Sequence, residues 1–80
     1  MDKPETLEFN KKSDIELGND NIARITISTW YLPKNLKESL KDATNIDWKF
    51  YGHFMDVACY GITKEKYDIL PEKFIIKLTY

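Results

Sequence analysis

The chain has 80 residues, of which 42% are hydrophobic and 14% aromatic, and its formal net charge is −1. This length predicts one domain, residues 1–80, in which residues 1–5 are expected to form a flexible tail. A nearly neutral charge argues against a protein built around nucleic acid or an anionic membrane, because both favour strongly basic surfaces. Cys59 is the only cysteine, which excludes an internal disulfide, and with a single histidine it excludes a closed zinc site.

The composition also indicates a cellular setting. No stretch approaches the roughly 18 apolar residues of a membrane span, and the first residues lack the apolar core of a signal peptide. A lone thiol is typical of a reducing compartment, so we expect a cytoplasmic protein that needs no cofactor and contacts no membrane. Arg24 is the only arginine among many lysines, isoleucines and asparagines, a usage typical of AT-rich genomes such as those of many bacteria, phages and plasmids.

The first predicted element is a β-hairpin over residues 6–17. Apolar residues alternate with polar ones at Leu7 and Phe9, and again at Ile15 and Leu17. A polar, turn-forming stretch separates the two alternating segments. We therefore expect the two segments to pair with each other.

The strongest predicted strand covers residues 22–31, after a turn signal at residues 18–21. β-branched residues crowd together here, and Ala23, Ile25 and Ile27 share one face. That face is expected to point into the core.

Pro33 ends this strand, and a helix is predicted over residues 35–44. Asn35 stands three residues before Glu38, the spacing at which an N-cap side chain and an N3 carboxylate satisfy each other's backbone N–H groups. Apolar residues follow on one face, and Asn45 is a typical helix stop.

The next segment, residues 47–60, is rich in aromatic rings and has two open interpretations. A turn near Gly52-His53 gives two antiparallel strands, roughly 47–51 and 55–61. Without that turn the segment is one long strand, in which Gly52 marks a kink.

The C-terminal part adds a short helix and a last strand. Thr63 is a candidate cap for a helix over residues 64–70, which Pro71 closes, and residues 74–80 alternate as a strand. From residue 22 the order is β-α-β-β-α-β, which resembles the ferredoxin-like arrangement. The expected class is α+β: a small, mostly antiparallel sheet with two short helices and an N-terminal β-hairpin, either ferredoxin-like or of another connectivity.

The sequence predicts no catalytic or metal site. A reactive thiolate needs a neighbouring base, but a hairpin that turns at Gly52-His53 would separate His53 from Cys59 by about 20 Å. The carboxylates are scattered among lysines and the glycines are isolated, so neither an acid–base pair nor a phosphate-binding loop is expected. The prediction is a protein that is not an enzyme.

One candidate binding surface contains Arg24, Trp30 and Tyr31. Strand alternation places Trp30 on the polar face with Arg24, where it is either covered by the N-terminal hairpin or exposed as an anchor for a partner protein. The leading hypothesis is a small intracellular protein-binding module that acts by occupying a partner, as an inhibitor or accessory protein of a phage, plasmid or bacterial conflict system. An open edge of the last strand would also permit a homo-oligomer.

The alternative hypothesis is weak binding of single-stranded nucleic acid, RNA in particular, through the aromatic segment. Such proteins stack bases on exposed rings and follow the backbone with basic side chains. The competing interpretation is that these rings fill the core of a small domain. The candidate stacking residues are Trp48, Lys49, Phe50, Tyr51 and Phe54.

Overall fold

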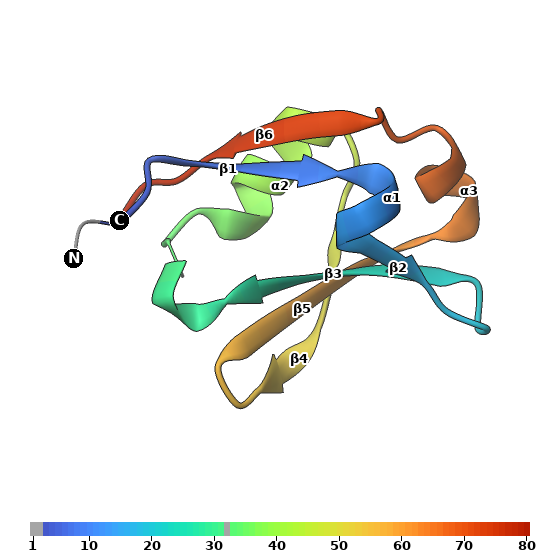
Figure 1. The fold of residues 1–80 in the computed structure, drawn as a ribbon, viewed down its shortest axis with the longest axis horizontal. Coiled ribbons are helices and arrows are strands. Elements are labelled where there is room, and N and C mark those ends of the chain that lie inside the picture. Colours follow the sequence, from blue (N-terminus) through green and yellow to red (C-terminus); the bar gives the residue numbers. More distant parts are fainter. Residues whose placement is uncertain (1–2, 32) are drawn as a thin grey trace.

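The computed structural model describes residues 3–31 and 33–80, and it confirms a small α+β fold with antiparallel sheets. Four strands form one sheet in the order β2-β3-β5-β4, and β1 pairs with β6 in a separate two-stranded sheet (Figure 1). The elements in chain order are β1 (Thr6–Asn10), α1 (Lys11–Asp14), β2 (Ile15–Leu17), β3 (Ile22–Ser28), the 3₁₀ turn η1 (Thr29–Tyr31), α2 (Leu36–Thr44), β4 (Lys49–Phe54), β5 (Val57–Thr63), α3 (Lys64–Asp68) and β6 (Lys73–Lys77).

The ferredoxin-like topology is not confirmed, although the element order from residue 22 is β-α-β-β-α-β. A ferredoxin-like sheet would place its last strand, β6, beside β3. Here β2 occupies that edge of β3, and β6 pairs with β1 instead. The physical reason is that a short turn joins β2 to β3, so these two strands pair as neighbours and leave no free edge of β3 for β6.

The prediction of an N-terminal hairpin over residues 6–17 was wrong. Both strands exist, but α1 lies between them and they belong to different sheets. The Asp14 carboxylate accepts a hydrogen bond from the Asn10 N–H at 2.6 Å, which closes the helical turn and redirects the chain. β1 is then free to stack its Phe9 ring on Phe74 of β6, with ring centres 5.5 Å apart.

The core lies between the β1–β6 pair with α2 on one side and the four-stranded sheet on the other (Figure 1). Its largest fully buried side chains are Trp48, Ile25, Leu40 and Ile76. They come from four different parts of the chain, so the core joins both sheets to α2. No helix in the described residues is long and apolar enough to cross a membrane.

Helix α2 forms where it was predicted, but its start is stabilised differently. The Asn35 side chain does not cap the helix; it bonds Thr79 twice, donating to Oγ1 at 3.3 Å and accepting from the backbone N–H at 3.1 Å. Asn45 ends the helix in the left-handed conformation, with φ 60°. The predicted capping box was therefore wrong, and the stop was correct.

The aromatic segment forms two antiparallel strands, so the first of its two interpretations is correct, but its turn is displaced. The turn lies at Met55-Asp56, since Phe54 pairs with Val57. Gly52, with φ 130°, instead marks a shift of register within β4.

Three smaller boundaries also differ from prediction. The strand that begins at Ile22 ends at Ser28, the last strand covers Lys73–Lys77, and the short helix covers Lys64–Asp68. The Thr63 hydroxyl accepts a hydrogen bond from the Lys66 N–H at 3.4 Å, as expected of a cap.

Candidate functional site

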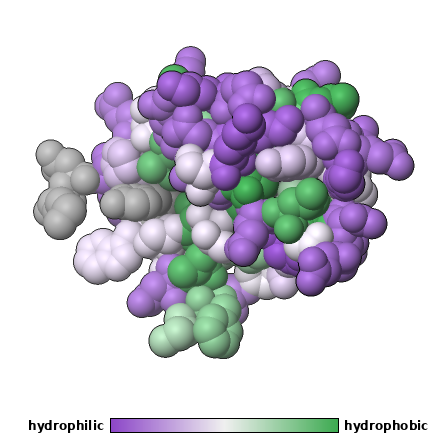
Figure 2. Space-filling model, turned by 45° about the vertical axis from the view of Figure 1, so that its right-hand side comes forward, coloured by the Kyte–Doolittle hydropathy of each residue, from purple (hydrophilic) through white to green (hydrophobic). Residues whose placement is uncertain are grey.

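Three large apolar side chains gather where β3, β4 and β5 end, and we call this group the apolar end: Trp30, Phe54 and Met55. They are 70%, 78% and 78% exposed. The β4–β5 hairpin projects from the rest of the molecule in Figure 1, and apolar side chains colour the lower projection in Figure 2. Trp30 therefore lies on the surface, which answers the question of whether the N-terminal strands cover it.

Backbone contacts join the two parts of the apolar end, which are Trp30 in η1 and the pair Phe54 and Met55 at the tip of the β4–β5 hairpin. The pairing of β3 with β5 runs to Ser28 and Val57, and one residue further the Thr29 N–H donates to the Asp56 C=O at 2.8 Å. This bond fixes the start of η1, and with it Trp30, against the tip of the β4–β5 hairpin. The backbone beside Trp30 is thus joined directly to the hairpin tip that carries Met55.

Met55 occupies an unfavourable backbone conformation. It is the first residue of a two-residue loop and has φ 55°, a region that favours glycine or asparagine. For another L-residue this conformation costs roughly 1–2 kcal/mol. The chain therefore has a large, exposed, apolar side chain at a position where a smaller residue would be more stable.

A second surface is the outer face of the four-stranded sheet, where Tyr51 lies against Gly61. A Cβ atom added to Gly61 would stand 2.7 Å from Cε2 of Tyr51, so the ring rests directly on the glycine. The Arg24 guanidinium carbon lies 5.0 Å from the ring centre, and the Lys49 Nζ lies 5.3 Å from it. Two cations thus flank a half-exposed ring.

Arg24 is also bonded to a carboxylate. Its guanidinium donates to both oxygens of Asp20, at 3.1 and 2.7 Å. The hydrogen bond from Arg24 is the main cause that lowers the pKa of Asp20 below its usual 3.8. In return, the bond to Asp20 raises the pKa of Arg24. Part of the positive charge on this face is therefore neutralised.

The structure separates the residues predicted for nucleic-acid stacking. Trp48 is only 1% exposed and its indole bonds Thr44 inside the core, so including it among the stacking residues was wrong. Phe50 packs against Tyr60 with ring centres 5.3 Å apart. Phe54 belongs to the apolar end, which leaves Tyr51 and Lys49 together on the outer face.

The predicted partner-binding residues are also divided. Arg24 lies on the outer face of β3, whereas Trp30 belongs to the apolar end, because β3 ends at Ser28 and η1 takes over. The side chain of Tyr31 lies outside the described part of the structure. The residue that sequence reasoning missed is Met55, since nothing in its neighbourhood has the Gly or Asn usual at such a loop.

His53 and Cys59 are closer in the fold than the sequence suggested, because the turn lies at Met55-Asp56. The register pairs His53 with Ala58 and Gly52 with Cys59. Successive positions of a strand point to opposite faces, so the imidazole and the thiol lie on different sides of the sheet. In the part of the chain that the structure describes, no three His, Cys, Asp or Glu side chains form a group that would hold a metal ion.

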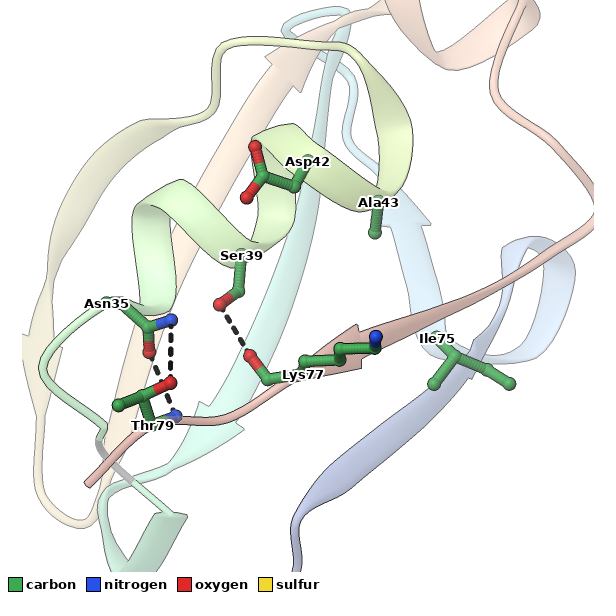
Figure 3. A pocket seen from close by; sticks show the side chains of 7 residues that line it. All are labelled: Asn35, Ser39, Asp42, Ala43, Ile75, Lys77 and Thr79. Atoms are coloured by element: carbon green, nitrogen blue, oxygen red, sulfur yellow. Dashed lines mark hydrogen bonds between the residues drawn. The ribbon is translucent and has the colours of Figure 1, made fainter.

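A third surface is a groove of about 490 Å³ between α2 and β6 (Figure 3). One end is closed by polar contacts: the Ser39 hydroxyl donates to the Lys77 C=O at 2.5 Å, and Asn35 bonds Thr79. The sticks in Figure 3 also show two apolar residues of the lining, Ala43 on the helix and Ile75 on the strand. The complete lining is Asn35, Ser39, Asp42, Ala43, Ile75, Lys77 and Thr79.

Compared with protein families, curated proteins and solved structures, the chain has no match in any of the three. The function is therefore inferred from the geometry of these three surfaces.

Proposed function

We propose that the protein is a protein-binding module that inserts its apolar end into a partner protein and acts by occupying it. The observation that carries this proposal is the exposure of Trp30, Phe54 and Met55, at 70–78% each, on η1 and the β4–β5 hairpin tip, which a backbone hydrogen bond joins. Tryptophan is enriched among the residues that dominate binding energy at interfaces, and aromatic residues and methionine are enriched in interfaces generally. Monomeric soluble proteins rarely expose large contiguous apolar patches, and where such patches occur they mark sites of interaction with other molecules.

The energetics favour binding without rearrangement. Burying a large apolar side chain completely contributes about 1.5–3 kcal/mol, and three are available here. The hydrogen bond between Thr29 and Asp56 already orders the backbone at both parts of the apolar end, so binding costs little further conformational entropy there. The free protein already holds Met55 in its unfavourable backbone conformation, so binding does not add this cost.

The wider setting is part of the same proposal. An inhibitor or accessory protein of a phage, plasmid or bacterial conflict system would need a surface for one partner and no chemistry of its own. The lysine-rich composition fits such a source, and the single thiol of Cys59, half-buried in β5, fits the cytoplasm.

The test is capture of a partner by matched variants. We would immobilise the wild type, the double variant Trp30→Ala/Phe54→Ser and the control Ile69→Ser, and expose each to lysate of the host cell. Ile69 is also exposed, at 72%, but it follows α3, at the opposite end of β5 from the apolar end. Wild type and control should retain the same protein, and the double variant should lose at least tenfold in affinity for it once it is purified. Equal capture by all three would refute the proposal, as would no capture by the wild type.

A second candidate function is weak binding of single-stranded nucleic acid on the outer face, with Tyr51 as the stacking ring. The flat ring on Gly61, flanked by Arg24 and Lys49, supports it. The bond between Arg24 and Asp20 counts against it, because that carboxylate would repel phosphate. This candidate therefore ranks second.

Fluorescence anisotropy of a labelled oligouridine at low salt tests this second function, since Trp48 is too buried to report stacking. Tyr51→Ala should abolish binding, and added salt should weaken it. Tyr67→Ala is the control, because Tyr67 also lies beside a lysine, Lys11, but on another face. Absence of binding by the wild type, or equal binding by both variants, would eliminate this function.

A further inference from the structure

We propose that the free edge of β6 binds an extended peptide as an added strand, and that this peptide carries an apolar residue between two acidic ones. The site lies in the groove between α2 and β6 (Figure 3), on elements that do not form the apolar end. It therefore goes beyond the proposed function, and either can be wrong without the other.

The first argument is the direction of the backbone groups of β6. In a strand, successive residues direct their N–H and C=O groups to opposite edges. The Leu78 N–H donates to the Glu5 C=O at 2.8 Å, so even-numbered positions face the β1 side. The Lys77 C=O accepts from Ser39 Oγ at 2.5 Å, so odd-numbered positions, including Ile75, face α2.

Helix α2 satisfies only part of this edge. The Thr79 N–H donates to the Asn35 side chain, and the Thr79 C=O accepts from the Lys34 N–H at 3.0 Å. Within residues 3–31 and 33–80, no hydrogen bond from the helix side reaches the Lys77 N–H or either backbone group of Ile75. The helix thus takes the place of a neighbouring strand as far as the Lys77 carbonyl, and beyond it the edge is open.

The second argument is the pattern of side chains along that edge. Lys73, Ile75 and Lys77 alternate on one exposed face of β6, and Ile75 is 57% exposed. Among the described residues, neither lysine lies within ion-pair distance of a carboxylate. A strand paired opposite Ile75 would bring its own residues, two positions to either side, against the two lysines. Acidic residues there, with an apolar residue between them, complement the edge.

The same pattern disfavours a second copy of the chain as the occupant. Two β6 strands paired antiparallel about Ile75 would set Lys73 of each against Lys77 of the other. Like charges directly opposite are destabilising. On the helix side, Asp42 and Ala43 line the groove, so small residues that are not acidic suit the peptide positions that point there.

The experiment uses the full chain and the capped peptide Ser-Glu-Thr-Val-Thr-Glu-Ser, followed by NMR amide exchange. Binding should slow exchange of the Ile75 and Lys77 amides and leave Ile76, which already faces β1, unchanged. The peptide with lysine in place of both glutamates should bind at least tenfold more weakly, and the peptide with proline in place of valine should not bind, because it has lost the N–H opposite Ile75.

Charge reversal supplies the matched control. The double variant Lys73→Glu/Lys77→Glu should prefer the lysine peptide, which a merely unfolded or damaged edge would not do. Binding that ignores the peptide's charge would overturn the proposal, as would protection spread over the apolar end. Protection of Ile75 that rises with protein concentration in the absence of peptide would also overturn it, by showing that a second copy occupies the edge.

Discussion

Trp48 and Thr44 are joined by a buried hydrogen bond, in which the indole Nε1 donates to the threonine Oγ1 at 3.0 Å. The same hydroxyl donates to the Leu40 C=O at 2.6 Å, so the pair fastens the last turn of α2 to the start of the aromatic segment. This bond holds the Trp48 side chain in the core. The rings that follow it in β4 are exposed, so one short segment contributes rings both to the core and to the surface.

The two tryptophans should report these different environments. In Trp48→Phe the remaining fluorescence comes from exposed Trp30, and we expect red-shifted emission that acrylamide quenches strongly. In Trp30→Phe the emission should be blue-shifted and shielded. Trp48→Phe should also lower the free energy of unfolding by about 2 kcal/mol, because it removes a buried hydrogen bond and leaves a void. Trp30→Phe, a surface change, should alter it by less than about 0.5 kcal/mol. The opposite quenching pattern would contradict the placement of both rings.

Replacing Met55 should separate stability from binding. Met55→Asn suits φ 55° better, so the urea midpoint should rise by the equivalent of about 1 kcal/mol. The same change should weaken capture of the partner through the apolar end. Gly52→Ala is the control in the opposite direction: an alanine at φ 130° should cost about 1–3 kcal/mol. A destabilising effect of Met55→Asn would show that the left-handed conformation of Met55 does not lower the stability of the wild type.

A side chain at position 61 should be destabilising while Tyr51 is present. In Gly61→Ala the new methyl group would meet the Tyr51 ring at 2.7 Å and Ile22 at 3.0 Å, and we expect a loss of about 1–3 kcal/mol in urea denaturation. In a Tyr51→Ala background the same substitution should cost clearly less, since only the contact with Ile22 remains. Equal costs in the two backgrounds would show that the ring does not rest on the glycine.

The pair formed by Asp20 and Arg24 should give the protein a specific response to acid. Because the pKa of Asp20 in the folded state lies below its usual 3.8, the pair's stabilisation is fully present above that pH. It is lost as the pH falls through the lowered value, since protonation then removes the bond to Arg24. The effect will be small, because both side chains are substantially exposed.

Urea denaturation between pH 2 and 6 measures this response. Asp20→Asn should make stability less dependent on pH below about 3.8. Arg24→Gln should do the same, and the double variant should show no further change, since all three variants lack the same ion pair. An acid dependence that survives in Asp20→Asn with Arg24 intact would assign it to other carboxylates.

Local chemistry was enough to predict several elements correctly. The β-branched residues around Ile25 predicted a strand, the apolar spacing around Leu40 predicted a helix, and Asn45 marked its end. Each of these depends on interactions within a few residues, which a sequence shows directly. The α+β class followed from the same local patterns.

Sequence by itself therefore determined most of the strands, the helices around Leu40 and after Thr63, and that the core carries the fold without a disulfide. Only the tertiary structure decided which strands are neighbours, because alternation at Leu7 or Phe74 is the same whichever partner the strand has. It also decided that Trp48 is buried while Trp30 and Phe54 are exposed, since a ring buries itself only where distant residues, such as Ile25 and Ile76, surround it. The candidate surfaces arise from those long-range choices, as the apolar end and the β6 edge both show.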